Sequence, residues 1–260
     1  MTLFDPGERK RRGVQLQSEL LGKSAAEPIS LLESSWRDFI FAEVWSRPGL
    51  DRRSRFLIAV AGAACESCAE DIVDGYVRGA LTTGELSQAE LREAALHLSV
   101  YAGWSRGTVL DRAITRVARA LDMAPVEVQP LRSAEWDSEQ RLIEGRENFT
   151  AAMTFPPPPP VTPYFEAGIL NFVFGEMWMR PGLDQRARRW VTMVGVADSA
   201  SSTPIRTHTY AALASGNATL AEMQEFVLQY ALHGGWPKAS VMQAVVFEMG
   251  KRVAEGLPYE

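Results

Sequence analysis

The sequence predicts an all-α protein built from two similar halves in tandem. Residues 41–55 and 174–188 agree at ten of fifteen positions without a gap, which is typical of an internal duplication. In both copies an Arg-Pro-Gly-Leu-Asp run follows apolar residues at helical spacing. Proline then ends one helix, glycine permits a turn, and Asp51 or Asp184 caps the next helix. No stretch combines period-two alternation with β-branched residues, so no strand is expected.

The spacing of apolar residues predicts a series of helices in each half. In the first half the expected helices cover residues 29–47, 51–69, 69–82, 87–102 and 105–121. In the second half one helix ends at residue 180, and others cover 184–198, 204–216 and 219–235. Residues 1–12 are expected to be disordered, and residues 13–22 are expected to form a short helix or an arm.

Each half also carries the sequence of a capping box. Ser87 is followed three residues later by Glu90, and Thr219 is followed in the same way by Glu222. In a capping box the hydroxyl and the carboxylate each accept a backbone N–H that the first turn of the helix leaves without a partner. Both copies therefore predict a helix that starts at the corresponding place.

The domain organisation follows from this repeat. We expect an N-terminal domain over residues 1–132, a helical segment and a proline-rich linker over 133–163, and a C-terminal domain over 164–260. Five consecutive prolines at 156–160 favour polyproline II, which acts as a stiff spacer. We expect the two halves to pack as a dimer within one chain, related by pseudo-twofold symmetry.

The composition is that of an ordinary globular protein. The apolar fraction is 46%, the charged fraction 23% and the net charge −5, and the basic residues are dispersed, so we expect no nucleic-acid partner. No apolar stretch reaches the roughly 18 residues of a membrane helix, and no signal peptide is visible, so neither a membrane nor export is expected. Two cysteines do not make a disulfide framework, which favours a reducing, cytoplasmic location.

The motifs resemble those of the carboxymuconolactone decarboxylase family. Glu-x-Trp-x-Arg-Pro-Gly-Leu-Asp is followed by His-x-x-x-Ala-Leu-x-x-Gly from His208 to Gly216, and then by a capped helix that ends in Gly-Gly-Trp. The resemblance implies helical domains, related to those of alkyl hydroperoxidase D-like proteins, and a lyase that needs no cofactor. Single-domain members form rings of subunits, so a tandem chain is expected to form a homo-oligomer, most simply a trimer.

The second half matches the family at each position that the resemblance marks as functional. The family's acidic position is Glu176, its aromatic position Trp178, its basic position Arg180 and its histidine His208. Two further polar residues, Tyr230 and His233, are expected to reach the same pocket. Chemistry agrees with these residue types, because an imidazole with a pKa near ~6.5 delivers a proton and an arginine holds a carboxylate. The resemblance implies that His208 and Glu176 are catalytic and that the other four bind substrate.

Structural interpretations of the same residues remain open. Glu176 and Arg180 are equally well placed to pair with each other at the helix ends. A histidine on a helix is more often structural than catalytic, and for His233 the structural interpretation is favoured. His97, His208 and His233 have no metal-ligand spacing, so no metal site is expected.

The first half departs from the family at the histidine. Tyr76 stands at the position of His208, and Tyr101 at that of His233. This half instead carries Cys65 and Cys68 in a Cys-x-x-Cys motif, with Glu43 upstream, as in a redox site at a helix start. The peroxidase-like relatives have a histidine after the second cysteine, which is absent here, so the proton relay is incomplete.

Three functions follow as hypotheses. The first is a cofactor-independent decarboxylase or isomerase that acts on a small carboxylated lactone or a related enolisable acid, with His208 transferring the proton. The second is a thiol peroxidase or disulfide reductase that uses Cys65 and Cys68. The third is a non-catalytic protein that binds a small molecule, which the replacement of histidine by Tyr76 favours.

Overall fold

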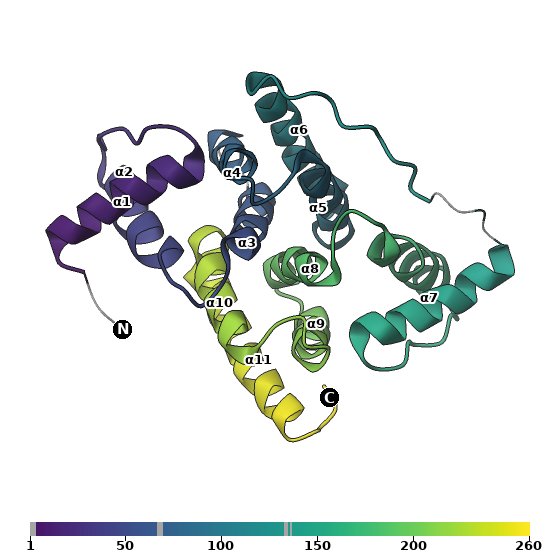
Figure 1. Cartoon of the computed structure of the whole chain (residues 1–260). Coiled ribbons are helices and arrows are strands. Elements are labelled where there is room, and N and C mark those ends of the chain that lie inside the picture. Colours follow the sequence, from purple (N-terminus) through teal and green to yellow (C-terminus); the bar gives the residue numbers. More distant parts are fainter. Residues whose placement is uncertain (1–3, 67–69, 133–134, 136) are drawn as a thin grey trace.

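A computed structural model describes residues 4–66, 70–132, 135 and 137–260, and these residues form helices and connecting segments without any strand (Figure 1). The all-α prediction is confirmed. The helices are α1 Pro6–Leu21, α2 Leu31–Ser35, η1 Trp36–Trp45, α3 Arg52–Cys65, α4 Glu70–Thr82, α5 Gln88–Ala102, α6 Trp104–Ala120, α7 Ser138–Met153, η2 Tyr164–Phe174, η3 Met177–Met179, α8 Gln185–Ser199, α9 Ser202–Ala214, α10 Leu220–Gly234 and α11 Trp236–Ala254.

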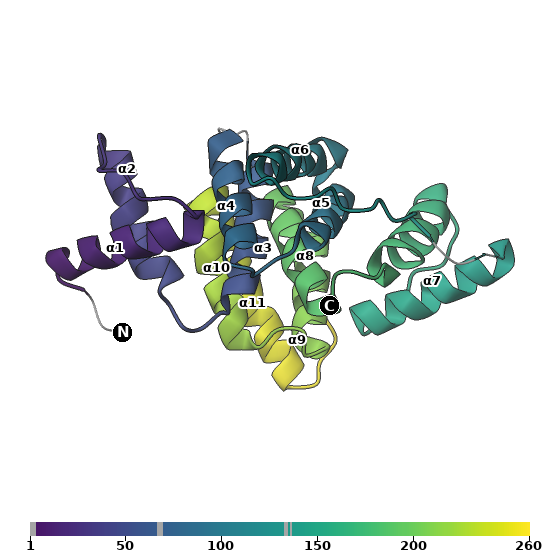
Figure 2. The same ribbon diagram turned by 45° about the horizontal axis from the view of Figure 1, so that its top comes forward.

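Helices α3 and α8 lie at the centre of the molecule. Each follows one copy of the repeated corner; α3 packs on α8 and α10, and α8 packs on α5. Helices α1 and α7 lie at opposite ends, beside η1 and η2 respectively (Figures 1 and 2). The arrangement is consistent with a pseudo-twofold relation between the halves, because α3 pairs with α10 where α8 pairs with α5.

One hydrophobic core joins the two halves. It contains Phe56 of α3 and Leu91 of α5 together with Trp190 of α8, Phe226 of α10 and Val246 of α11, all fully buried. Burial of large apolar side chains is the dominant favourable term in folding. Because this core draws on both halves, the stability of each half depends on the other.

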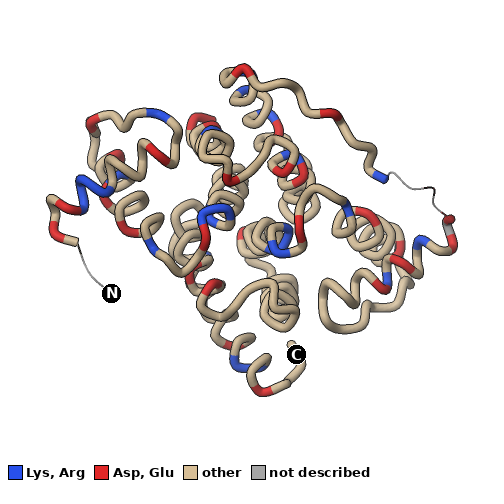
Figure 3. The backbone as a smooth tube through the Cα atoms, viewed as in Figure 1, with Lys and Arg blue, Asp and Glu red and all other residues tan. Residues whose placement is uncertain are grey.

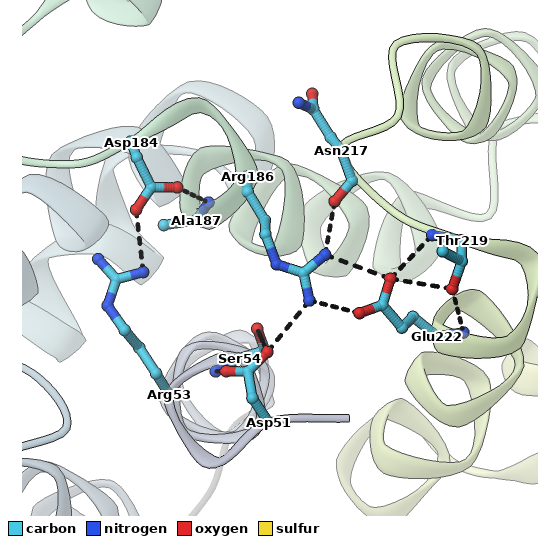
Figure 4. Close-up of polar contacts among 9 residues, drawn as sticks. All are labelled: Asp51, Arg53, Ser54, Asp184, Arg186, Ala187, Asn217, Thr219 and Glu222. Carbon is cyan, nitrogen blue, oxygen red and sulfur yellow. Dashed lines mark hydrogen bonds and ion pairs between the residues drawn. The ribbon is translucent and has the colours of Figure 1, made fainter. Parts of the chain in front are cut away.

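The repeated corners are linked to each other by crossed ion pairs. Asp51 and Asp184 cap α3 and α8 as predicted, each accepting a backbone N–H three residues further on. Arg186 of α8 then contacts Asp51 at 3.1 Å, and Arg53 of α3 contacts Asp184 at 3.0 Å (Figure 4). The two helix starts are thus held side by side by contacts at matching positions of the repeat.

Both predicted capping boxes are present. The Ser87 and Thr219 hydroxyls accept the backbone N–H of Glu90 and Glu222, and each glutamate accepts the backbone N–H of its capping residue at 2.8 Å. Glu222 also binds Arg186 (Figure 4), at 2.8 Å, and Glu90 binds Arg53 at 2.8 Å. The caps therefore connect α5 and α10 to the central helices.

The expected disorder of residues 1–12 is wrong for the described part of that segment. Helix α1 begins at Pro6, with Asp5 accepting N–H groups of the first turn. The helix packs so closely on η1 that a Cβ at Gly13 would lie 2.2 Å from the Arg37 carbonyl oxygen. An Asp-Pro start signal and this close packing outweigh the charge of the 6–12 run.

The helix before each corner also differs from expectation. In the first half, the helix expected over residues 29–47 is divided into α2 and the π-helix η1. In the second half, the helix expected to reach residue 180 is the π-helix η2, which ends at Phe174 and is followed by η3. The second-half helix ends earlier in the repeat than η1, and Gly175 follows it where the first half has Ala42. A Cβ at Gly175 would lie 2.4 Å from the Asn171 carbonyl oxygen, so the chain at this end requires a glycine.

Residues of both charges are distributed along the chain. Lys and Arg positions, and Asp and Glu positions, occur in both halves rather than in one segment (Figure 3). Within the described part of the chain, no helix has the length and apolar character needed to cross a membrane.

Candidate functional site

Arg180 already has a carboxylate partner within the chain. Its guanidinium binds Glu93 of α5 at 2.6 Å, and Arg188 lies 3.4 Å from the same carboxylate. Arg47, the equivalent residue of the first half, binds Glu225 of α10 in the same way at 2.5 Å. Ion pairs of this kind join one half to the other, so Arg180 has a structural partner in Glu93, and its binding of substrate stays a prediction.

Glu176 lies at the rim of a cavity rather than beside His208. Its carboxylate pairs with Arg141 of α7. Glu176 and Arg180 both line a cavity of about 370 Å³ next to the second corner, but they do not pair with each other, so that alternative is wrong. Glu176 is held by α7, which leaves the orientation of His208 to other residues.

His208 is buried in the interior of the second half. It lies on α9 and is 8% exposed. Its Nδ1 lies 3.4 Å from a guanidinium nitrogen of Arg189, and its ring packs edge-to-face on Tyr101 of α5 at 5.1 Å. Burial, and then the charge of Arg189, lower the pKa of His208 to about 3. The imidazole is therefore neutral at pH 7, and its contact with an arginine donor leaves the proton on Nε2.

Arg189 is a fully buried cation whose contacts include no carboxylate of the described residues. It stands on α8 and is 0% exposed. Its guanidinium lies over the ring of Trp178 at 4.7 Å, donates to the backbone carbonyl of Ala152, and approaches Asn217 Oδ1 at 3.4 Å. Burial lowers the pKa of Arg189 to about 10. A buried charge without an opposite charge is costly, and such charges mark sites for charged ligands.

Aromatic and polar side chains complete this cluster. Trp178 donates from Nε1 to the Tyr101 hydroxyl at 2.7 Å, and its ring meets His97 edge-to-face at 5.1 Å. His97 in turn contacts Thr192 at 2.9 Å, and burial followed by nearby arginines lowers its pKa well below the usual value. The chain thus joins Arg189, Trp178, Tyr101 and His97 around one buried position, with residues from both halves.

Helix α7 and η2 cover the cluster. Phe149 and Ala152 of α7 pack with Phe174 and Trp178 in a small apolar layer that is separate from the main core. His208 is 8% exposed and does not line the cavity of about 370 Å³ beside Glu176.

The structure places Tyr230 and His233 away from His208. His233 of α10 packs edge-to-face on Tyr76 at 5.4 Å and lies 6.1 Å from the ring of Trp36, both in the first half. Tyr230 stacks on Phe226, and its hydroxyl is buried without a hydrogen-bond partner among the described residues. The expectation that these two side chains join the His208 pocket is therefore wrong, because α10 faces α3 rather than α9.

Cys65, the first cysteine of the motif, lies at the end of a helix instead of at a helix start. Cys65 is the last residue of α3, and Cys68 lies outside the described residues. Burial, followed by the nearby charge of Asp198, raises the pKa of the Cys65 thiol to about 12, whereas a reactive cysteine needs a lowered pKa. Glu43 pairs with Arg9 at 2.8 Å. In the described part of the chain, no group of three potential ligands is arranged to hold a metal ion.

Sequence reasoning missed Arg189. The repeat offered a sign of this residue. Arg189 lies in the run 187–197, all of which is buried, and it aligns with Phe56 of the first copy, so a charge stands where the other half has an apolar side chain. Arg180 was assigned to the site because it belongs to the repeated motif. Its ion pair with Glu93 could not be predicted, because the two residues are far apart in the sequence. Tyr101 and His97 were hidden for the same reason, since they reach the site from the other half.

The fold and the site together define an all-helical protein with a buried cluster of Arg189, His208 and aromatic side chains. A family model described as "Carboxymuconolactone decarboxylase family" matches residues 31–116. The chain is 30% identical over 129 residues to a 4-carboxymuconolactone decarboxylase of Acinetobacter baylyi, which covers 46% of this chain and 95% of that protein. It is also 35% identical over 107 residues to a nitrosuccinic acid decarboxylase of Metarhizium robertsii, covering 39% of this chain and 71% of that protein. The chain belongs to the carboxymuconolactone decarboxylase family.

Proposed function

We propose that the protein is a cofactor-independent decarboxylase of small carboxylic acids, and that Arg189 binds the carboxylate that leaves as CO₂. The observation that supports this most strongly is the buried guanidinium of Arg189, which contacts His208 and is paired with no carboxylate of the described residues. Both relatives are named as decarboxylases of small acids, which agrees with this proposal.

The substrate class follows from the chemistry of CO₂ loss. When the C–CO₂ bond breaks, its electron pair stays on carbon and needs an adjacent acceptor. A lactone carbonyl and a nitro group are both acceptors of this kind. We therefore infer a small acid in which the carbon that bears the carboxylate is also attached to a carbonyl, lactone carbonyl or nitro group, so that an enolate or nitronate forms first.

His208 is the proton donor in this proposal. A substrate carboxylate that binds Arg189 offsets the guanidinium charge, which is the second cause of the lowered pKa of His208, and so favours uptake of a proton from solvent by the imidazole. Burial, the larger cause, keeps the imidazolium a minor form at pH 7. After CO₂ leaves, that proton moves from the imidazolium to the carbanion carbon, and His208 returns to its neutral state. Each turnover consumes one proton, and the rate is expected to fall as pH rises.

The surroundings of Arg189 suit exchange of partners. The Arg189 guanidinium donates a hydrogen bond to the backbone carbonyl of Ala152, in the last turn of α7. Backbone carbonyls at the C-terminal end of a helix carry partial negative charge. A carboxylate is a stronger acceptor than a carbonyl, so substrate would displace Ala152 from Arg189. Displacement would loosen α7 where it covers the cluster.

The test is CO₂ release from a panel of carboxylactones, β-keto acids and α-nitro acids. Arg189→Met and His208→Gln are each expected to lower kcat/KM by about a hundredfold or more, the usual size of a lost charge-stabilising or proton-transfer group. Arg186→Met is the matched control, because Arg186 lies on the same helix but pairs with Asp51 and Glu222, and it should retain activity within about threefold.

Two results would refute the proposal. One is wild-type turnover that Arg189→Met leaves unchanged, since the carboxylate would then be bound elsewhere. The other is release of CO₂ from no member of the panel by the folded protein. If Arg180→Met, with Glu93 removed as well, abolished turnover while Arg189→Met did not, the cavity beside Glu176 would be the site.

A further inference from the structure

The first half contains a second histidine–tyrosine pair that the sequence comparison conceals. In the second half, His208 of α9 meets Tyr101 of α5 at 5.1 Å and 88°. In the first half, Tyr76 of α4 meets His233 of α10 at 5.4 Å and 87°. The helix α4 carries a tyrosine where its equivalent α9 carries a histidine, and α10 carries a histidine where its equivalent α5 carries a tyrosine. The edge-to-face contact between the two rings is the same in both halves. The first half has therefore not lost its imidazole, because the other half supplies it.

The neighbours of the two pairs differ at one decisive position. In the second half Arg189 lies over Trp178 at 4.7 Å. In the first half the equivalent residue is Phe56, whose ring meets Trp45 at 4.9 Å. Trp45 also stacks on Tyr76 at 5.8 Å. The first-half pair is thus enclosed by aromatic rings, without the buried cation that marks the second half.

A cavity reaches Tyr76, the tyrosine of this pair. It has a volume of about 510 Å³, within the ~300–1,000 Å³ range of small-molecule sites, and Tyr76 and Trp36 form part of its wall. The charged side chains that line it, Lys23, Glu33 and Asp71, are exposed. Its deeper wall is uncharged, so a charged ligand buried there would have no partner for its charge.

Several buried polar atoms at this site lack hydrogen-bond partners among the described residues. They are Tyr76 Oη, Trp45 Nε1, His233 Nε2 and Gln17 Oε1. The indole N–H of Trp45 approaches the Tyr76 hydroxyl without the geometry of a hydrogen bond. Native proteins satisfy almost all buried polar groups, and a cluster of exceptions beside a cavity indicates a ligand with matching groups.

We propose that this cavity is a second ligand site, which binds an uncharged, planar molecule bearing a hydroxyl or carbonyl group. The rings of Trp36 and Tyr76 provide faces on which a flat molecule packs. Tyr76 and Gln17, which line the cavity, supply a hydrogen-bond donor and an acceptor for its polar group. The two halves would then differ in ligand class, because Arg189 selects a carboxylate and Phe56 does not.

The test uses the full chain labelled with ¹⁵N-tryptophan, whose seven indole N–H groups report on both sites by NMR. Phenol is the neutral probe, and benzoate carries a carboxylate on the same ring. Phenol is expected to shift the Trp36 and Trp45 signals in a saturable manner. Benzoate is expected to leave these two signals in place.

Two variants localise the binding. Tyr76→Phe keeps the ring and removes the hydroxyl, and it should weaken phenol binding about tenfold, which is the loss of one buried hydrogen bond. Ile72→Trp fills the cavity that Ile72 lines and should abolish the shifts. Arg189→Met, in the other half, should leave phenol binding unchanged, so failure of the proposed function does not affect this result.

Three outcomes would overturn the proposal. They are the absence of shifts at Trp36 and Trp45 up to saturating phenol, equal phenol affinity in the wild type and Tyr76→Phe, and tighter binding of benzoate than of phenol at these signals. If Ile72→Trp does not fold, Tyr76→Phe decides the question alone, because the deletion of one hydroxyl leaves the aromatic packing in place.

Discussion

Arg189 and Phe56 occupy equivalent positions of the repeat, and this single difference separates the two halves chemically. Arg189 places a positive charge beside His208 and Trp178, whereas Phe56 packs on Trp45. The sequence predicted the residue types of a decarboxylase site in the second half. It did not predict that Arg180 is committed to Glu93, because the pair bridges two helices that are far apart in the chain.

The histidines make a prediction about acid stability. All three are buried with lowered pKa values: His208 to about 3 and His233 to about 4, chiefly by burial, and His97 well below its usual value. The unfolded chain binds protons near pH 6.5 that the folded chain does not, so the stability is full above that pH and is lost as pH falls. Between pH 7.5 and 5.5 the free energy of unfolding should fall by about 4 kcal/mol.

Urea unfolding at pH 7.5, 6.5 and 5.5 measures this loss. The window lies above the ordinary pKa values of Asp and Glu, near ~4, so carboxylates contribute little to the slope. His233→Phe provides a control, since one fewer buried imidazole should reduce the slope by about a third. A free energy of unfolding that stays constant across this range would show that the histidines titrate normally.

At the scale of elements, spacing and end signals predicted most helices. The corner caps and both capping boxes occur as expected, because they depend on residues within one helical turn. In α1, residues 13–21 lie where a short helix or an arm was expected, and the part over residues 6–12 was missed because a charged run looks disordered when the surface that it packs against is unknown. The π-helical form of η1 and η2 was not predictable either, since apolar spacing does not distinguish it from α-helix.

The buried pair between Arg180 and Glu93 makes a prediction about the link between halves. Arg180→Met leaves Glu93 with its charge poorly compensated in a mostly buried place, and should lower the free energy of unfolding by about 3–5 kcal/mol. Arg180→Met combined with Glu93→Leu should recover only part of that loss, because the buried Arg188, 3.4 Å from Glu93, then also loses its carboxylate partner. Urea unfolding of the two single variants and the double variant measures the coupling.

An exposed pair serves as the control for this cycle. Lys251 and Glu255, 3.9 Å apart on α11, have side chains that are 75% and 49% exposed. Lys251→Met should change the free energy of unfolding by less than about 0.5 kcal/mol. Additive effects of Arg180→Met and Glu93→Leu would mean that the pair contributes nothing specific to the joining of the halves.

At the scale of the whole molecule, apolar side chains remain exposed on two surfaces. Ile29 and Leu31, next to α2, are 92% and 91% exposed, and Trp236 and Phe247 of α11 are each 58% exposed. Large exposed apolar groups that cluster on a surface indicate association with another chain. We therefore keep the prediction of a homo-oligomer, with a trimer as its simplest form.

Light scattering coupled to size exclusion tests this prediction. A trimer has three times the 28.7 kDa mass of one chain. Leu31→Glu together with Phe247→Glu should shift the population towards the monomer, because each introduces charge into an apolar contact. A wild-type protein that elutes as a monomer at micromolar concentration would contradict the prediction.

The central claim is that Arg189 and His208 form one carboxylate-binding unit, and a histidine titration by NMR tests it most directly. The pKa of His208 is measured in the wild type with and without saturating acetate, succinate or benzoate, and again in Arg189→Met. We expect a bound carboxylate to raise the pKa of His208 from about 3. We expect Arg189→Met to raise the same pKa without a ligand and to abolish carboxylate binding. If neither the carboxylates nor Arg189→Met changes the pKa of His208, the two residues do not form such a unit.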